Sequence, residues 1–357
     1  MSLKEIKTSA IGIMSGTSLD GLDLCYVNFH FKKNWRFEII ATEFIRYDGE
    51  MQTSLSNAHQ LSAQHLEYLH EEFGKFTANC VNGFIRKKNL PKPDLVCSHG
   101  HTVFHDPANG ITRQISDGQI IATKTEITCI SDFRTEDVSL GGQGAPLVPI
   151  GDELLFADYQ ACLNLGGFSN ISFRDKNERL AFDICPVNIV LNPLANVLGK
   201  EYDENGNIAR GGSIDQHLLK SLNELQLYSA SPRPSLAREW LEESFLPVIN
   251  KDNSSVQEKI ATVTEHAAEQ ISLVINQKAG DGKVLVTGGG AKNSFLIERL
   301  KALSHAEIVI PETELIDFKE ALIFALLGVL KFNDQTNVLR SVTGASRDSS
   351  SGKISLP

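Results

Sequence analysis

The stretch Ala10–Asp23, AIGIMSGTSLDGLD, decides the fold that this sequence predicts. Its apolar residues Ile11–Met14 are typical of a buried strand, and Ser15–Ser18 then gather glycine and hydroxyl side chains at the end of that strand. From Leu19 the apolar pattern resumes, which predicts a second strand after a turn. Such a turn can direct backbone N–H groups and hydroxyls at a phosphate. A hairpin with a polar turn is the alternative interpretation, and it would be favoured for an isolated Gly-Thr-Ser sequence.

The same design recurs near the middle of the chain. An apolar strand, Ala161–Leu165, runs into Gly166-Gly167, and further apolar residues follow at Ile171–Phe173 and Leu180–Ile184. In the first half, Trp35–Ile45 supplies the corresponding third strand. Two halves that each begin with strand, turn, strand and strand, and continue through helices, predict duplicated α/β domains. Their glycine turns are expected to converge on one ligand at the carboxyl ends of strands.

Later elements follow from apolar periodicity. Helical spacing is expected within Leu61–Lys88 and Gln257–Gln277, and a strand at Lys283–Thr287 leads into the glycines Gly288–Gly290. The last strong element is a predicted helix over Asp317–Phe332, with Glu320 in its first turn. The Asn/Ser/Gly-rich tail beyond it has little to bury and is expected to be poorly ordered at its end.

Composition limits the possible functions. The chain has 357 residues, which favours two domains, and its net charge of −10 argues against binding a DNA or RNA backbone. Its six cysteines are scattered without CxxC pairing, so we expect neither zinc nor disulfides, and the alternating His99, His101 and His105 do not change this. No apolar run approaches membrane-spanning length and the first residues lack an apolar segment, so no membrane contact and a cytoplasmic location are expected.

These motifs resemble the actin-like and sugar-kinase superfamily and, more closely, the anhydro-N-acetylmuramic acid kinases. The resemblance covers Ile11 to about Leu330, and DFR…GGQGAPLVP is its most specific block. In chain order the matching motifs are MSGTSLDGLD, SHGHTVFH, ISDFRTEDVSLGGQGAPLVP, LNLGGFSNIS, FDICPVN, YDENGNIARGG, VTGGGAKN and DFKEALIFA.

The resemblance implies two duplicated actin-like ATPase (ribonuclease H-like) domains that face each other across a nucleotide and sugar cleft. Residues 1–155 with 317–357 would form the N-terminal lobe, and residues 156–316 the C-terminal lobe. It also implies an ATP-dependent enzyme, expected as a homodimer, that opens the 1,6-anhydro ring of 1,6-anhydro-N-acetylmuramic acid with water and phosphorylates O6. Two alternatives remain: another sugar or small-acid kinase of the superfamily, or a non-catalytic ATP-binding actin-like protein.

The same resemblance implies the catalytic residues. Asp183, behind apolar Ala181-Phe182, matches the catalytic aspartate that would activate water, although a turn or cap residue ahead of Pro186 is an equal alternative from the residues alone. Glu320 matches a glutamate that would assist that step. Its alternative role is favourable charge at a helix N-terminus.

Binding residues are implied in the same way. Arg134 and Thr102 would contact the sugar, with a weak surface ion pair as the alternative for the arginine. Many sugar kinases carry an aspartate in the first strand itself, where this chain has Met14. Because Mg²⁺ keeps most of its waters and needs only one or two protein carboxylates, Asp20, just past the first turn, would be its contact. The nucleotide would be bound by the glycine turns and their neighbours: Gly16, Thr17, Ser18, Leu19, Asp20, Gly21, Leu22, Asp23, Gly166, Gly167, Gly288, Gly289 and Gly290.

Two departures from the family pattern affect the sugar pocket. The family commonly reads FDTGPGN where this chain reads FDICPVN, which places Ile184, Cys185 and Val187 near Asp183. It also reads SHGQT where this chain has His101. Bulkier residues beside Asp183 are expected to narrow or reshape the pocket, while the aspartate and the glycine turns are retained.

Overall fold

The computed structural model describes residues 5–16, 19–230, 236 and 238–357, and divides into two compact units. The first comprises Met1–Leu155 and Phe318–Pro357, and the second comprises Phe156–Asp317. The predicted N-terminal lobe also included Asp317, which lies in the second unit. The binding and catalytic functions assigned to the two lobes stay a prediction. Within the described residues no helix is both long and apolar enough to cross a membrane.

The first unit is built on a six-stranded sheet with the order β13-β7-β4-β1-β2-β3. Strands β1, β2 and β3 are antiparallel neighbours, whereas β1, β4 and β7 run parallel. The bounds are β1 (Ile6–Ser15), β2 (Gly21–Phe31), β3 (Trp35–Arg46), β4 (Leu95–Ser98), β7 (Thr128–Ser131) and β13 (Lys353–Ser355), with a separate hairpin of β5 (His101–Asp106) and β6 (Ile111–Ile115).

The second unit repeats this topology in a five-stranded sheet with the order β10-β9-β8-β11-β12. Strands β8, β9 and β10 are antiparallel, and β8, β11 and β12 are parallel. Two sheets of the same order, three antiparallel strands followed by two parallel ones, confirm the predicted duplicated actin-like, ribonuclease H-like fold. The bounds are β8 (Ala161–Leu165), β9 (Phe168–Asp175), β10 (Glu178–Pro186), β11 (Lys283–Thr287) and β12 (Glu307–Val309).

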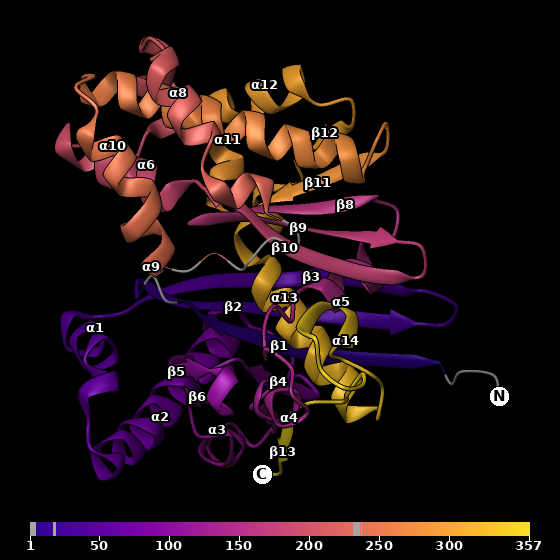
Figure 1. The fold of residues 1–357 in the computed structure, drawn as a ribbon. Helices are drawn as coiled ribbons and strands as arrows, with labels where there is room; N and C mark the ends of the chain where they lie inside the picture. The colour runs from indigo at the N-terminus through magenta and orange to yellow at the C-terminus, as the bar shows by residue number, and fades with distance from the viewer. Residues whose placement is uncertain (1–4, 17–18, 231–235, 237) are drawn as a thin grey trace. The chain divides into compact units, whose positions relative to one another are not determined.

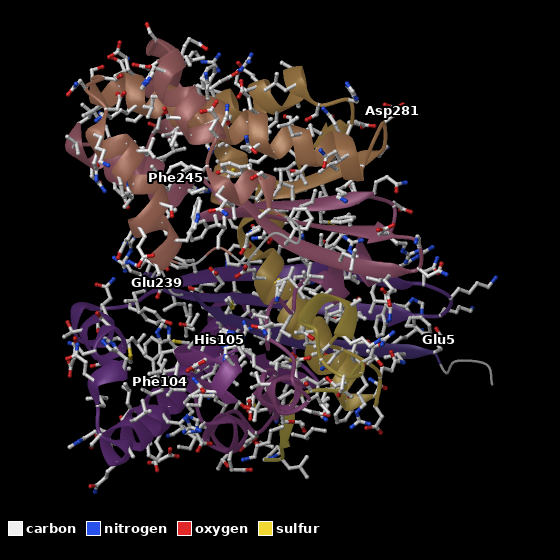
Figure 2. All side chains as sticks on the ribbon, viewed as in Figure 1. Glu5, Phe104, His105, Glu239, Phe245 and Asp281 are labelled. Carbon is white, nitrogen blue, oxygen red and sulfur yellow. The ribbon has the colours of Figure 1, made fainter. Side chains whose placement is uncertain are left out.

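Helices cover both sheets. In the first unit these are α1 (Gly49–Ser56), α2 (Ala63–Lys88), α3 (Gly118–Thr125), α4 (Thr135–Ser139), α5 (Pro149–Leu155) and α14 (Arg340–Thr343). In the second they are α6 (Asn188–Val197), α7 (Asn207–Gly211), α8 (Gln216–Asn223), α9 (Arg238–Trp240), α10 (Leu246–Lys251), α11 (Val256–Lys278) and α12 (Ser294–Leu303). Phe245, in the π-helical turn before α10, lies among the helices of that unit (Figure 2).

Helix α13 (Thr313–Phe332) packs against the first sheet although it follows β1 by some three hundred residues of chain (Figure 1). Two glycines make this close approach possible. A Cβ on Gly12 of β1 would meet the backbone of Ala321, and a Cβ on Gly328 of α13 would meet Cys97 of β4. Between Ala321 and Gly328 the helix backbone therefore lies directly on the strands, which holds this part of α13 in place.

The structure corrects two expectations about the end of the chain. Helix α13 begins at Thr313, soon after Pro311, so Glu320 lies about two turns inside it and the interpretation based on a helix N-terminus is wrong. The tail is also ordered up to its end. Strand β13 pairs with β7, and the side chain of buried Asn337 donates to the carbonyl of Ser351 and accepts from its N–H, which ties the tail to the unit.

Candidate functional site

The first glycine turn joins β1 to β2. Thr17 and Ser18 lie outside the described residues, so their predicted contacts are not placed. On either side, the N–H of Leu19 donates to the carbonyl of Gly16 at 3.4 Å, and Leu19 adopts a left-handed φ of 58°. The hydroxyl of Ser15, at the end of β1, accepts from the Tyr47 hydroxyl at 2.7 Å and lies 3.0 Å from Nδ1 of His101. The flank of the turn is thus held by a buried network.

The residues after this turn have different environments. Asp20 is exposed, whereas Gly21 and Leu22 are buried. Leu22 belongs to the apolar core, and a Cβ on Gly21 would meet the carbonyl of Ile45, so both have clear packing roles. Asp23 is half-buried and pairs with Met14 across the hairpin.

In the second unit the turn Gly166-Gly167 receives the start of helix α6. The carbonyl of Gly167 accepts from the N–H groups of Val187 and Ile189 at 2.8 and 3.2 Å, and the Asn188 side chain donates to the carbonyl of Gly166 at 2.9 Å. The N-terminal N–H groups of a helix need acceptors, and here the turn supplies them. Asn188, the first residue of α6, therefore ties the predicted phosphate turn to that helix.

A cavity of about 480 Å³ lies beside this turn within the second unit. Gly289 and Gly290 line this cavity. Gly288, just before them, has a left-handed φ of 82° and lies close to the backbone of Leu165. The volume of the cavity falls in the range of small-molecule sites. The other lining residues are rich in amides: Asn188, Leu191, Asn192, Tyr202, Asp203, Glu204, Asn205, Lys292 and Asn293.

Sequence reasoning placed the glycines of this cavity but missed most of its lining. Asn192 comes from a segment that gives no local signal of binding. For Tyr202 and Asn205 a signal is present, because both belong to the family motif YDENGNIARGG. Asp203 in that motif accepts from the N–H groups of Ile208 and Ala209, so its carboxylate fixes the loop.

Asp183 lies near the end of β10, where the pairing with β9 is irregular between Asp183 and Cys185. Its Oδ2 accepts from the backbone N–H of Leu236 at 2.9 Å, a contact that sequence reasoning could not foresee. Burial raises the pKa of the Asp183 carboxyl, and the Leu236 N–H partly opposes that effect. The departing residues Ile184, Cys185 and Val187 are all fully buried, so they belong to the core behind the aspartate.

In the first unit Arg134 follows β7 and is half-buried. Burial lowers its pKa to about 10, which leaves it charged at neutral pH, and the carboxylates of Glu320 and Asp137 favour that charge. Its guanidinium donates to Nε2 of His99 through Nε and Nη2, at 3.1 and 2.8 Å. Thr102 lies on β5, where its hydroxyl accepts from the Gln114 side chain at 3.4 Å.

Glu320 shares helix α13 with a buried ion pair. Nζ of Lys319 lies 2.7 Å from Oδ1 of Asp152 in α5, and both side chains are almost fully buried. Although Glu320 itself keeps exposed surface, crowding by protein atoms raises the pKa of its carboxyl, and the charges of Arg134 and Lys319 oppose this. Glu320 and Arg134 are thus electrostatically linked within the first unit.

Among the described residues no three His, Cys, Asp or Glu side chains are placed to hold a metal ion. Mg²⁺ does not require such a group, because it retains most of its waters and takes one or two protein carboxylates beside substrate phosphates. An exposed carboxylate next to the first turn, as Asp20 offers, fits that demand.

The duplicated strand order of the two sheets defines a protein of the actin-like α/β class. The family model described as anhydro-N-acetylmuramic acid kinase matches residues 8–357. Anhydro-N-acetylmuramic acid kinases of Mannheimia succiniciproducens and Pasteurella multocida are 33% and 34% identical to this chain, over 98% and 99% of it and over 99% and 98% of their own lengths. That of Shewanella sp. strain ANA-3 is 35% identical over 96% of this chain and 97% of its own length. The chain belongs to the anhydro-N-acetylmuramic acid kinase family.

Proposed function

We propose that this protein uses ATP to convert 1,6-anhydro-N-acetylmuramic acid and water into N-acetylmuramic acid 6-phosphate and ADP, a step in the recycling of cell-wall sugar. The observation that carries the proposal is the family match across nearly the whole chain. The retained Asp183, with its raised carboxyl pKa, supports a proton-accepting role.

Asp183 is the proposed base. It takes a proton from the water that attacks C1, the C1–O6 bond breaks, and the released O6 becomes the nucleophile toward the γ-phosphorus of ATP. A carboxylate that is partly desolvated accepts a proton more readily than one in bulk water, because its charged form is less stabilised. Glu320 is proposed to orient the water, and Arg134 and Thr102 to hold the sugar.

The nucleotide is proposed to occupy the cavity lined by Gly289 and Gly290. Its phosphates would be bound by the Gly166-Gly167 turn and by the first turn, Gly16–Asp23. Backbone glycines suit this task because they admit a large ligand close to their N–H groups. Asp20 is the proposed contact for Mg²⁺, which supplies neutralising charge to the phosphates when bound.

A labelled-water experiment tests the coupled reaction. In ¹⁸O-water the heavy oxygen is expected on the anomeric carbon, because water attacks C1, and the new phosphate ester is expected to contain none. The product must be trapped quickly, before free anomeric exchange blurs the label. Label in the phosphate ester would mean that water attacks phosphorus, and the proposal would be wrong.

A substrate screen separates this function from that of another kinase of the superfamily. Phosphotransfer from ATP is compared for 1,6-anhydro-N-acetylmuramic acid, N-acetylmuramic acid and N-acetylglucosamine. The anhydro sugar is expected to be phosphorylated fastest, and only with water as co-substrate. Equal rates with a simple amino sugar would favour the alternative.

We also propose a cytoplasmic homodimer that acts on a small amino sugar and binds neither nucleic acid nor membranes. The net charge of −10 supports the exclusion of nucleic acid. Analytical ultracentrifugation of the purified chain tests the dimer: a single species of monomer mass across micromolar concentrations would contradict it. Removal of Mg²⁺ with a chelator is expected to abolish turnover, and activity should return on readdition.

A further inference from the structure

His99 and Arg134 form a hydrogen-bonded pair in the first unit. His99 follows β4, is only 4% exposed, and packs against the ring of Phe324 with 4.6 Å between centroids. Its Nδ1 lies 2.9 Å from the carbonyl of Gly100, and its Nε2 faces the Arg134 guanidinium. A carbonyl can only accept and a guanidinium can only donate. His99 must therefore carry its proton on Nδ1 and offer Nε2 as a neutral acceptor.

The protonation state of the His99 ring agrees with this hydrogen-bond geometry. Burial and the adjacent Arg134 charge hold the pKa of the imidazole well below its ordinary value, so the ring is neutral at physiological pH. His101 adds a smaller effect in the same direction.

The second acceptor of Arg134 is also neutral. Its Nη1 donates to the carbonyl of Gly144. That loop is held by Asp137, a fully buried carboxylate that accepts from the N–H of Gly144 and from the hydroxyl of Thr343, both at 2.8 Å. The nearby acidic group thus holds the loop, and the loop in turn holds the arginine.

Arg134 therefore keeps unused capacity. A guanidinium has five N–H donors, and the bonds to His99 and Gly144 engage three of them. Within the described residues it forms no ion pair, and Glu320 and Asp137 act on it only at longer range. A side chain that is rigidly held, charged and left with two donors by the part of the chain that the structure describes is suited to bind an anion.

We infer that His99 is a positioning residue: it orients Arg134 through a neutral acceptor and so leaves the arginine's charge for an anionic group of the reactants. This inference rests on the proposed function of Arg134 in substrate binding. A carboxylate at position 99 would hold the guanidinium at least as well but would neutralise part of its charge. The anion is either the carboxylate of the acidic sugar or the transferring phosphoryl group, and both share the same chemistry.

Three substitutions separate orientation from charge. His99→Gln keeps a neutral acceptor near the position of Nε2 and should retain kcat/KM to within about fivefold. His99→Leu fills the space beside Phe324 without an acceptor and should lose about 100-fold, since Arg134 is no longer oriented. His99→Glu restores an acceptor with charge and should fall at least about tenfold below His99→Gln.

Two sugars then identify the anion. Each variant is assayed with 1,6-anhydro-N-acetylmuramic acid and with 1,6-anhydro-N-acetylglucosamine, which lacks the carboxylate. If Arg134 binds the sugar carboxylate, His99→Glu raises KM for the acidic sugar and removes the enzyme's preference for it. If Arg134 acts on the phosphoryl group, kcat falls equally with both sugars. Either result supports the inference.

A buried histidine in the other unit provides the control. His266 is 0% exposed, and among the described residues its ring bonds to Tyr228 and Asn223 and to no arginine, so His266→Gln is expected to change stability but neither KM nor kcat. Equal kinetics for His99→Gln and His99→Glu, or wild-type kinetics for His99→Leu, would overturn the inference. If Arg134→Lys is also fully active, the proposed function of Arg134 fails as well. If that variant is inactive while His99→Leu is active, only the role of His99 fails.

Discussion

The two sheets share one topology but end their parallel strands differently. In the first unit β4 is followed directly by His99, whose side chain bonds to that of Arg134, shortly beyond the end of β7. In the second unit β8 and β11 end in Gly166-Gly167 and Gly288–Gly290, beside a cavity of about 480 Å³. The first arrangement offers one oriented charge, and the second offers open backbone and amides. Because β1, the counterpart of β8, is also followed by a glycine turn, the difference between the units lies beyond β4 and β11: the first unit has the bonded pair of His99 and Arg134 there, and the second has glycines.

The largest expected effect on turnover comes from replacing Asp183, the proposed base at the end of the second sheet. Asp183→Asn keeps the shape and the bond from Leu236 but removes the proton acceptor, so kcat should fall by about 10³-fold. ATP affinity should remain within about twofold, because no proton is taken in binding. Initial rates and equilibrium binding of ATP measure both quantities.

The control for this prediction is Asp175→Asn, an exposed carboxylate at the end of β9 in the same sheet, which should leave turnover unchanged. The pH profile gives a second readout. Because burial raises the pKa of Asp183, the acid limb of kcat/KM should lie above the ordinary aspartate pKa of 3.8, with activity lost as pH falls through the raised pKa. Turnover of Asp183→Asn within a few-fold of wild type would exclude Asp183 as the base.

The sequence was most informative where the determinants are local. The strands around Gly16 and Gly166-Gly167, and the helix expected over Gln257–Gln277, follow from apolar periodicity and glycine positions within a few residues. The start of α13 was expected at Asp317 rather than Thr313, although apolar Leu315 and Ile316 already lie in the first turn of the helix. The hairpin β5–β6 was missed because its strands mix polar and apolar residues.

Long-range contacts could not be predicted in this way. The bond from Leu236 to Asp183 joins residues 53 positions apart, and those from Arg134 to His99 join residues 35 positions apart. Motifs indicated that Asp183 and Arg134 matter, but only the folded chain shows what holds each side chain. The sequence indicates His99 only as part of the motif SHGHTVFH and as a histidine without the partners that zinc needs, whereas in the structure its side chain bonds to Arg134.

The second prediction contrasts buried histidines of the two units. His99 is assigned to orienting an arginine, whereas His266 lies in a closed network with Tyr228 and Asn223 and should serve stability alone. Burial lowers the pKa of His266 to about 3. The unfolded chain, with an ordinary histidine pKa of 6.5, binds more protons below that pH. Stability from neutral His266 is thus present above pH 6.5 and is lost as pH falls toward 3, by about 2 kcal/mol between pH 7 and pH 5.

The chain has two tryptophans, Trp35 in the first unit and Trp240 in the second, so a Trp35→Phe background reports on the second unit alone. Urea unfolding followed by Trp240 fluorescence at pH 7 and pH 5 should show this loss. In His266→Gln the pH dependence should flatten, although the variant is less stable at pH 7. Parallel pH dependence in the two proteins would contradict the assignment.

The smallest expected effect tests whether open backbone in the second unit matters to a ligand. An added Cβ at Gly289 would find only Nδ2 of Asn188, at 3.9 Å, so Gly289→Ala should fold without strain. Because this glycine lines the cavity, the methyl group would occupy space that the nucleotide is proposed to fill. KM for ATP should rise about three- to tenfold with little change in kcat, as expected when binding is weakened equally in the ground and transition states. Gly83→Ala is the matched control: its Cβ meets nothing within 4 Å on helix α2, so the KM for ATP should not move. If Gly289→Ala binds ATP like wild type, the nucleotide does not approach this turn, and the contrast between the two sheets would rest on the cavity alone.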